Sequence, residues 1–210
     1  MIRAETLSLA GPAGAIETRL EFDEAMTSPA AFGVACHPHP LFGGTMDNKV
    51  THVIARAMVE WGAPAFRFNF RGVGASAGKF DNGRGEVDDL AAVVAEGRRR
   101  FPSAALWLGG FSFGAFVALR GAARFAPEKL VAVAPPVARF DLGEVTHPDC
   151  DWLLVQGDAD EIVPSESVLA WAANQPHKPR LNVLAGAGHF FHGRLHELKP
   201  LLHEFLTSGR

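Results

Sequence analysis

The sequence has 210 residues, of which 48% are hydrophobic, with 16 Phe and no Tyr. This length suits one domain over residues 1–210, and a domain of this size buries roughly 70% of the surface of its unfolded chain. The formal net charge is −3 and no long basic run is present, so the chain lacks the concentrated positive face that nucleic-acid binding requires, and we expect no such partner.

The N-terminal segment and the number of cysteines indicate where in the cell the protein is located. The opening residues, MIRAETLSLAGPAG, lack the continuous apolar stretch of a secretory signal, and no window of the sequence has the length and apolarity of a membrane span. The two cysteines, Cys36 and Cys150, are too few to indicate a disulfide framework. These features predict a soluble, cytoplasmic protein that does not bind a membrane.

In chain order, the first predicted element is a β-hairpin in residues 3–24, where two short segments flank a Gly-Pro turn. Beyond it, short apolar runs alternate with segments of helical periodicity. We expect strands at 30–36, 64–70, 104–111, 129–135, 151–157 and 180–186, and helices at 47–62, 85–101, 114–123, 166–175 and 194–206.

This alternation indicates the fold class. Strands that are apolar throughout and alternate with helices predict an α/β protein with a mostly parallel, doubly wound sheet and helices on both faces. Ligands of such sheets bind beyond the carboxyl ends of the strands. Functional residues are therefore expected directly after the strands.

One motif lies at such a position. Residues 110–114, Gly-Phe-Ser-Phe-Gly, fit the pattern G-x-S-x-G between a predicted strand and a predicted helix. Glycines on either side of Ser112 leave room for a sharp turn that exposes the hydroxyl, and the start of the helix offers N–H groups to a developing negative charge. The alternative interpretation is that Ser112 only caps the helix.

A serine nucleophile needs a base and a group that orients the base. Asp158, Asp160 and Glu161 follow the strand predicted at 151–157, and His189 follows the last predicted strand in a glycine-rich segment. The order Ser, Asp, His, with each residue after a strand, predicts a Ser-His-Asp hydrolase site.

The sequence resembles the α/β-hydrolases, and it is similar to the small lidless bacterial hydrolases related to dienelactone hydrolase. The resemblance spans residues 37–190 and rests on HPHPLFGGTMDNKV, RFNFRGVGASAG, GGFSFGAFVA, GDADEIVP and GAGHFF. It implies that Ser112 is the nucleophile, that His189 is the general base and that Asp160, rather than Asp158, is the carboxylate. It also implies an α/β-hydrolase fold and an acyl-enzyme formed on Ser112.

The resemblance further implies an oxyanion hole. One donor would be the N–H of Phe113, and the second would come from the segment after residues 30–36. Pro38 and Pro40 have no N–H, so the match to the family's His-Gly-x pattern indicates His39, with Leu41 as the second candidate. This chain departs from the family at that point, because a proline replaces the usual glycine.

The expected binding site is open. Only 15 residues, 136–150, separate the strands predicted at 129–135 and 151–157, too few for a multi-helix lid, so no substantial cap domain is expected. We expect Phe42, Phe111, Phe113 and Val137 to line the substrate site. Free access of water favours hydrolysis of small or extended esters.

Several alternatives stay open. His37 and His39, with His192 and His196, offer imidazoles for a zinc site, although no cysteine accompanies them; we expect neither a metal nor a cofactor, and His37 to orient the oxyanion loop. The leading hypothesis is an esterase or thioesterase acting on a small-molecule ester. A peptidase or amidase would use the same three residues, and a hydrolase-like module that only binds a ligand is a further possibility.

Overall fold

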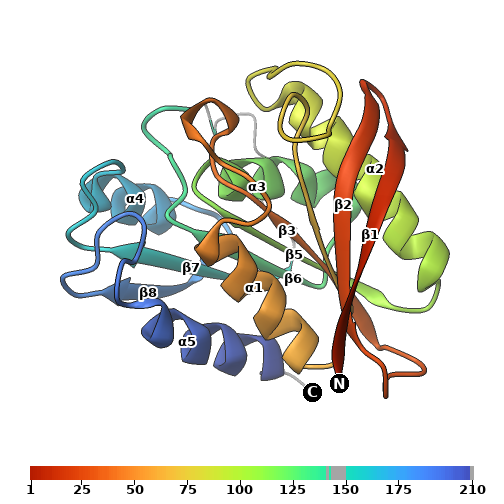
Figure 1. Cartoon of the computed structure of the whole chain (residues 1–210). Helices are drawn as coiled ribbons and strands as arrows, with labels where there is room; N and C mark the ends of the chain where they lie inside the picture. The colour runs from red at the N-terminus through yellow and green to blue at the C-terminus, as the bar shows by residue number, and fades with distance from the viewer. Residues whose placement is uncertain (141, 143–149, 209–210) are drawn as a thin grey trace.

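The computed structural model describes residues 1–140, 142 and 150–208, and within them the chain forms one sheet of eight strands and five α-helices (Figure 1). All the elements predicted from the sequence are present within a few residues of their expected bounds. The strands are β1 (Ile2–Gly11), β2 (Gly14–Asp23), β3 (Ala31–Cys36), β4 (Ala65–Phe68), β5 (Ala105–Phe111), β6 (Lys129–Val133), β7 (Asp151–Gly157) and β8 (Arg180–Leu184); the helices are α1 (Lys49–Glu60), α2 (Arg84–Arg100), α3 (Phe113–Phe125), α4 (Ser165–Ala173) and α5 (Leu195–Thr207).

The sheet begins with the predicted hairpin and is parallel beyond it. β1 pairs with β2 in antiparallel register, and Gly11 faces Gly14 across the turn. β2 also pairs antiparallel with β4, whereas β4, β3, β5, β6, β7 and β8 are parallel neighbours. The strand order β1-β2-β4-β3-β5-β6-β7-β8 confirms a mostly parallel sheet with an N-terminal β-hairpin.

Helices cover both faces of the sheet. On one face α1 packs against α5, and Ile54, Met58 and Leu198 from these helices are buried together with Trp107 of β5. On the other face α2 packs against α3, and buried residues of α4 belong to the same core. Figure 1 shows α1 and α5 on the same side of the sheet. The doubly wound arrangement predicted from the alternating pattern is therefore confirmed.

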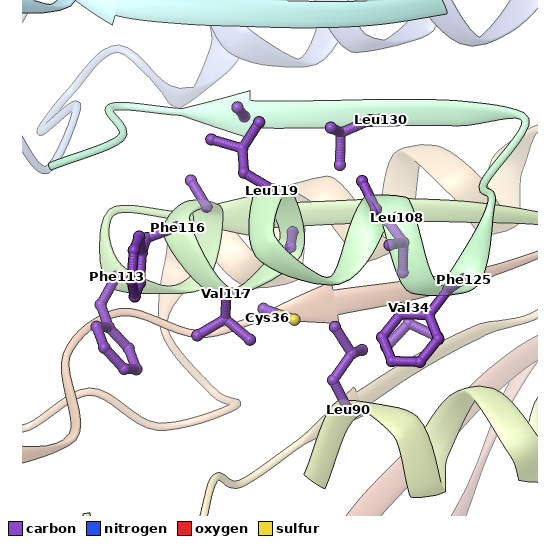
Figure 2. Packing of buried hydrophobic residues seen from close by; sticks show 14 of the residues in the cluster. Val34, Cys36, Leu90, Leu108, Phe113, Phe116, Val117, Leu119, Phe125 and Leu130 are labelled. Atoms are coloured by element: carbon purple, nitrogen blue, oxygen red, sulfur yellow. The ribbon is translucent and has the colours of Figure 1, made fainter. Parts of the chain in front are cut away.

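Helix α3 is packed along its length. Figure 2 shows Val117 and Leu119 of α3 in one buried cluster with Val34 of β3, Leu108 of β5 and Leu130 of β6. Full burial of one such side chain contributes about 1.5–3 kcal/mol to folding. This packing fixes α3 on three central strands, and with it the position of the turn that joins β5 to α3.

The carboxyl ends of the parallel strands meet at one edge of the sheet. The segments after β3, β5, β7 and β8 all begin at this edge. Residues 134–150 join β6 to β7, and of these 141 and 143–149 lie outside the described residues. An interval of this length is too short for a multi-helix lid. Within the part of the chain that the structure describes, the helices all fall short of the length and apolarity needed to span a bilayer.

Candidate active site

Ser112 connects β5 to α3 in a backbone conformation that is unusual for a residue with a side chain. Its φ is 53° and its ψ is −119°, a region that costs a non-glycine residue on the order of 1–3 kcal/mol. The N–H of Ser112 donates to the carbonyl of Val133 at 2.8 Å, which ties the turn to the end of β6. The strained turn thus holds the hydroxyl at the carboxyl edge of the sheet.

The glycines beside Ser112 are required by close backbone contacts. A Cβ on Gly110 would lie 2.2 Å from the carbonyl oxygen of Gly114, and a Cβ on Gly114 would lie 2.2 Å from that of Cys36. Backbone atoms cannot move aside as a flexible side chain can. Glycine is therefore needed on both sides of the serine, because the end of β5, the start of α3 and the end of β3 pack with their backbones in close contact.

His189 follows β8 and contacts both of the other predicted residues. Its Nε2 lies 3.0 Å from Oγ of Ser112, and its Nδ1 lies 2.8 Å from Oδ2 of Asp160. Because an ionised carboxylate only accepts, Nδ1 carries the hydrogen and Nε2 accepts from the Ser112 hydroxyl. The imidazole is buried and lies against the ring of Phe111, with centroids 5.0 Å apart.

Asp160 follows β7 and is held by several donors. One carboxylate oxygen accepts from the N–H groups of Ile162 and Val163, at 2.9 and 2.7 Å, and the other accepts from Gln156 as well as from His189. Burial raises the pKa of Asp160, but the hydrogen bonds from His189 and the two N–H groups outweigh burial and keep the pKa below its ordinary value. Asp160 is therefore ionised and oriented.

The two other acidic residues after β7, Asp158 and Glu161, form hydrogen bonds with backbone N–H groups and not with the ring of His189. Asp158 accepts from the N–H of Gly186 on the exposed side of the loop. Glu161 accepts from the backbone N–H of His189 at 3.1 Å, so it holds the main chain of the histidine rather than its ring. This contact of Glu161 is not predictable from the sequence, since no local pattern links residues 161 and 189.

Two backbone amides close to Ser112 are available as donors. Within the described residues, neither the N–H of Phe113 nor that of His39 donates a hydrogen bond to the protein. The N–H of Leu41, the second candidate for the oxyanion loop, donates to Nδ1 of His39 at 3.2 Å. Of the two alternatives in this segment, His39 is the one with a free amide.

His37 joins the segments after β3 and β4. Its Nδ1 donates to the carbonyl of Pro38 at 2.6 Å, and its Nε2 accepts from the N–H of Phe70 at 3.0 Å. Burial lowers the pKa of His37 to about 4, although the bond to Pro38 opposes the shift. A neutral His37 with both ring nitrogens engaged agrees with the orienting role expected for it.

A pocket of about 380 Å³ opens above Ser112 and His189. Aromatic side chains form much of its wall, and Phe42 at its rim is 79% exposed. The other side chains in the wall include Asn48, Pro136, Arg139, Phe140, Ile162, Val163 and Phe190. The pocket has the size and the apolar character of a site for a small organic substrate.

The predicted substrate residues are only partly in this wall. Phe42 and Phe113 line the pocket, as expected. Phe111 is completely buried behind His189, because it is the last residue of β5 and faces the core shared by α1 and α5. Val137 packs against the core on the other face. Neither Phe111 nor Val137 is among the residues that form the pocket wall, so the prediction that these two side chains line it is wrong.

Two residues of the wall, Arg139 and Phe140, had no role predicted from the sequence, and both lie close to His39. The ring of His39 lies within 6 Å of those of Phe42, Phe80, Phe113 and Phe140, with centroid distances of 4.7, 4.8, 5.0 and 5.9 Å. Burial lowers the pKa of His39, and the nearby charge of Arg139 lowers it further. These rings come from four separate chain segments, so no local sequence signal could have grouped them.

The zinc hypothesis requires a cluster of ligands. Among the described residues, no three His, Cys, Asp or Glu side chains are close enough to hold a metal ion. Both ring nitrogens of His37 are occupied by hydrogen bonds, and His196 lies 3.8 Å from Glu197 on the exposed face of α5. The four histidines considered from the sequence are therefore not brought together.

Comparisons with known proteins match part or most of the chain. Residues 42–142 match the family described as serine aminopeptidase, S33, a segment that contains Ser112 but neither Asp160 nor His189. An uncharacterised protein of Rickettsia prowazekii (strain Madrid E) is 35% identical over 209 residues, which cover 94% of this chain and 87% of the relative.

Solved structures extend the match to nearly the whole chain. A serine hydrolase without a lid from Xanthomonas campestris is 41% identical with a TM-score of 0.92, covering 97% of this chain and 94% of that one. An α/β serine hydrolase homologue from Coxiella burnetii is 43% identical with a TM-score of 0.92, covering 97% of both chains. Taken with the sheet order and the serine turn, these likenesses show that the chain belongs to the α/β-hydrolase superfamily, among its serine hydrolases.

Proposed function

We propose that the protein is an esterase that cleaves small carboxylic esters or thioesters through an acyl-enzyme on Ser112. The observation that carries the proposal is the continuous hydrogen-bond chain from Ser112 through His189 to Asp160 at the floor of the pocket. A cytoplasmic location belongs to the proposal, and the chain's two cysteines, Cys36 and Cys150, are too few to indicate the disulfide framework of a secreted protein.

In the first half of the reaction, His189 acts as the general base. Nε2 of His189 takes the proton of the Ser112 hydroxyl as Oγ attacks the carbonyl carbon, and the imidazolium then gives that proton to the departing alcohol or thiol. Asp160 holds the Nδ1–H tautomer and stabilises the imidazolium without taking the proton. The product of this half is an ester between the substrate's acyl group and Ser112.

The free amides of Phe113 and His39 would stabilise the intermediate. Each tetrahedral intermediate carries a negative oxygen, and one well-placed N–H contributes about 3 kcal/mol to its stabilisation. Phe113 is the first residue of α3, so its N–H also lies at the positive end of the helix dipole. These two amides form the proposed oxyanion hole.

In the second half, water replaces the alcohol. His189 removes a proton from a water molecule that attacks the acyl carbon, and it returns the proton to Oγ of Ser112 as the acid leaves. The pocket is open to solvent beside Phe42, which allows water to reach the acyl-enzyme.

A peptidase or amidase is the second candidate, because the family matched by residues 42–142 is described as a serine aminopeptidase. An aminopeptidase must bind the ammonium group of its substrate, for which a carboxylate is the suitable partner. The described residues of the pocket wall include no Asp or Glu, and they include Arg139, which would repel a cation. These charges favour an ester over a free peptide N-terminus.

Labelling and turnover test the proposal together. A fluorophosphonate probe is expected to modify the wild-type protein at Ser112 and to leave Ser112→Ala unmodified. Hydrolysis of p-nitrophenyl butyrate is expected to fall at least about 10³-fold in Ser112→Ala. Ser28→Ala is the matched control, because Ser28 is exposed and precedes β3 at the opposite edge of the sheet; it is expected to retain full labelling and activity.

The alternatives give different results. A folded wild-type protein that neither reacts with the probe nor hydrolyses the ester would support a module that only binds ligands. Faster turnover of p-nitroanilides than of p-nitrophenyl esters would support an amidase. Circular dichroism of each variant establishes that a loss of activity is not a loss of fold.

A further inference from the structure

We infer that Arg139 selects esters that carry a carboxylate at the end remote from the scissile bond. The inference rests on the proposed esterase function and specifies its substrate class. Four features of the pocket support it: the charges in its wall, the absence of an ion-pair partner for Arg139 among the described residues, the effect of Arg139 on the pKa of His39, and the apolar surface of the same wall.

The pocket wall carries an unbalanced charge. Arg139 is the one permanently charged side chain among its described residues, and no carboxylate offsets it there. Asp160, the carboxylate that binds His189, is not part of this wall, and it is engaged by His189 and by the N–H groups of Ile162 and Val163. A substrate in the pocket therefore meets a positive potential, which attracts an anionic group.

Among the described residues, Arg139 has no carboxylate partner. Ten other arginines in the described chain form ion pairs with carboxylates, and Arg71 with Asp89 is an example at 2.8 Å. Arg139 forms none within the same residues, although its side chain is exposed at the pocket. An unpaired guanidinium presents parallel N–H donors that match the two oxygens of a carboxylate.

The positive charge of Arg139 acts on another residue of the pocket wall, His39. It contributes to lowering the pKa of His39, whose ring forms part of the wall beside the amide proposed for the oxyanion hole. His39 and Arg139 are thus close enough to interact electrostatically. A carboxylate bound to Arg139 would lie in the same pocket as the reacting ester.

The pocket that contains both Arg139 and Ser112 has an apolar wall that suits an apolar part of the substrate. Phe140 follows Arg139 directly and its ring packs against those of His39 and Phe113, while Phe42 and Phe190 add exposed aromatic surface to the same pocket. The complementary ligand has an apolar chain or ring with an ester at one end and a carboxylate at the other. Monoesters of dicarboxylic acids and acyl esters of hydroxybenzoates have this form.

Two matched substrate pairs test the inference. Mono-4-nitrophenyl adipate and 4-nitrophenyl hexanoate differ by a carboxylate on the acyl side; 4-acetoxybenzoate and 4-acetoxybenzamide differ by a carboxylate on the alcohol side. In at least one pair, Arg139→Gln is expected to lower kcat/KM for the anionic ester about tenfold and to change that for the neutral ester less than twofold. Arg139→Lys is expected to retain part of the preference, and Arg139→Glu to reverse it.

Arg124→Gln is the matched control for loss of one positive charge. Arg124 lies in the last turn of α3, at the end of that helix remote from Ser112, and pairs with Asp88. Its replacement is expected to leave the ratio of anionic to neutral turnover unchanged. Because Arg139 is exposed, the wild-type preference is expected to weaken as salt rises from 0.05 to about 0.5 M.

The outcomes separate this inference from the proposed function. Hydrolysis of the neutral esters with an anionic-to-neutral ratio that Arg139→Gln does not alter, in either pair, would overturn the role of Arg139 and leave the esterase intact. Absence of turnover for all four esters, together with absence of fluorophosphonate labelling, would instead overturn the esterase itself.

Discussion

At the scale of single residues, the hydroxyl of Ser112 is held at the active site by a strained backbone conformation. Ser112 occupies φ 53° and ψ −119° although it carries a Cβ, and the packing of α3 on β3, β5 and β6 holds it there. Such strain persists only where the surrounding structure determines the conformation. The backbone conformation that the proposed nucleophile requires therefore lowers the stability of the fold.

Replacement of Ser112 by glycine and by alanine is expected to separate the strain from the chemistry. Both variants lack the nucleophile, but only glycine adopts this backbone conformation without cost. We expect Ser112→Gly to have a higher free energy of unfolding than Ser112→Ala by about 1 kcal/mol, measured by urea denaturation. A less stable glycine variant, as at an ordinary helix position, would show that the turn is not strained.

At the scale of elements, a buried imidazole joins two segments that border the site. His37 after β3 binds the N–H of Phe70 after β4, and the same segment carries the His39 amide proposed for the oxyanion hole. Protonation of His37 would remove the acceptor at Nε2. The position of the oxyanion segment is thus coupled to the neutral state of a histidine that does not contact the pocket.

This coupling predicts a pH-dependent stability. The pKa of His37 is about 4 in the folded protein and 6.5 in an unfolded chain, so the unfolded state binds more protons between these values. The contribution of His37 is present in full above pH 6.5 and is lost as pH falls towards 4, by about 3 kcal/mol in total.

A non-titrating variant isolates the contribution of His37. His37→Gln retains one donor and one acceptor, and its free energy of unfolding is expected to fall about 3 kcal/mol less than that of the wild type between pH 7 and pH 4. Urea denaturation at several pH values gives both curves. Parallel curves would mean that His37 does not titrate in this interval, or that it is protonated equally easily in the folded and unfolded states.

At the scale of the whole molecule, a buried lysine connects the sheet to the last helix. Nζ of Lys129, in the first residue of β6, donates to the carbonyls of Phe205, Leu206 and Ser208 at 3.0, 2.8 and 2.7 Å. These carbonyls lie at the C-terminal end of α5, where a cation also complements the helix dipole. The contact fixes the helix that follows the His189 segment.

Lys129→Met is expected to lower the free energy of unfolding by about 2–3 kcal/mol, because the aliphatic stem is kept while three carbonyls lose this donor. Lys199→Met is the control, since Lys199 lies on α5 but is exposed and pairs with Glu60; we expect a change below about 0.5 kcal/mol. Thermal and urea denaturation measure both. Equal effects of the two substitutions would contradict a specific role for Lys129.

The sequence by itself determined the order and type of the elements and the points at which Ser112, Asp160 and His189 leave the sheet. These properties depend on local patterns: apolar runs, helical periodicity, and glycines where the chain turns sharply. The choice of Asp160 over Asp158 and of His39 over Leu41 followed from the family resemblance, and the hydrogen bonds agree with both.

Only the tertiary structure decided which side chains form the pocket. Phe111 and Val137 were expected in its wall but face the two cores, whereas Arg139 and Phe140 form the wall instead. The direction of a side chain at the end of a strand depends on which helices cover each face, and the wall depends on which loops meet above the sheet. Both are set by contacts between residues far apart in the chain, which no local pattern of residues records.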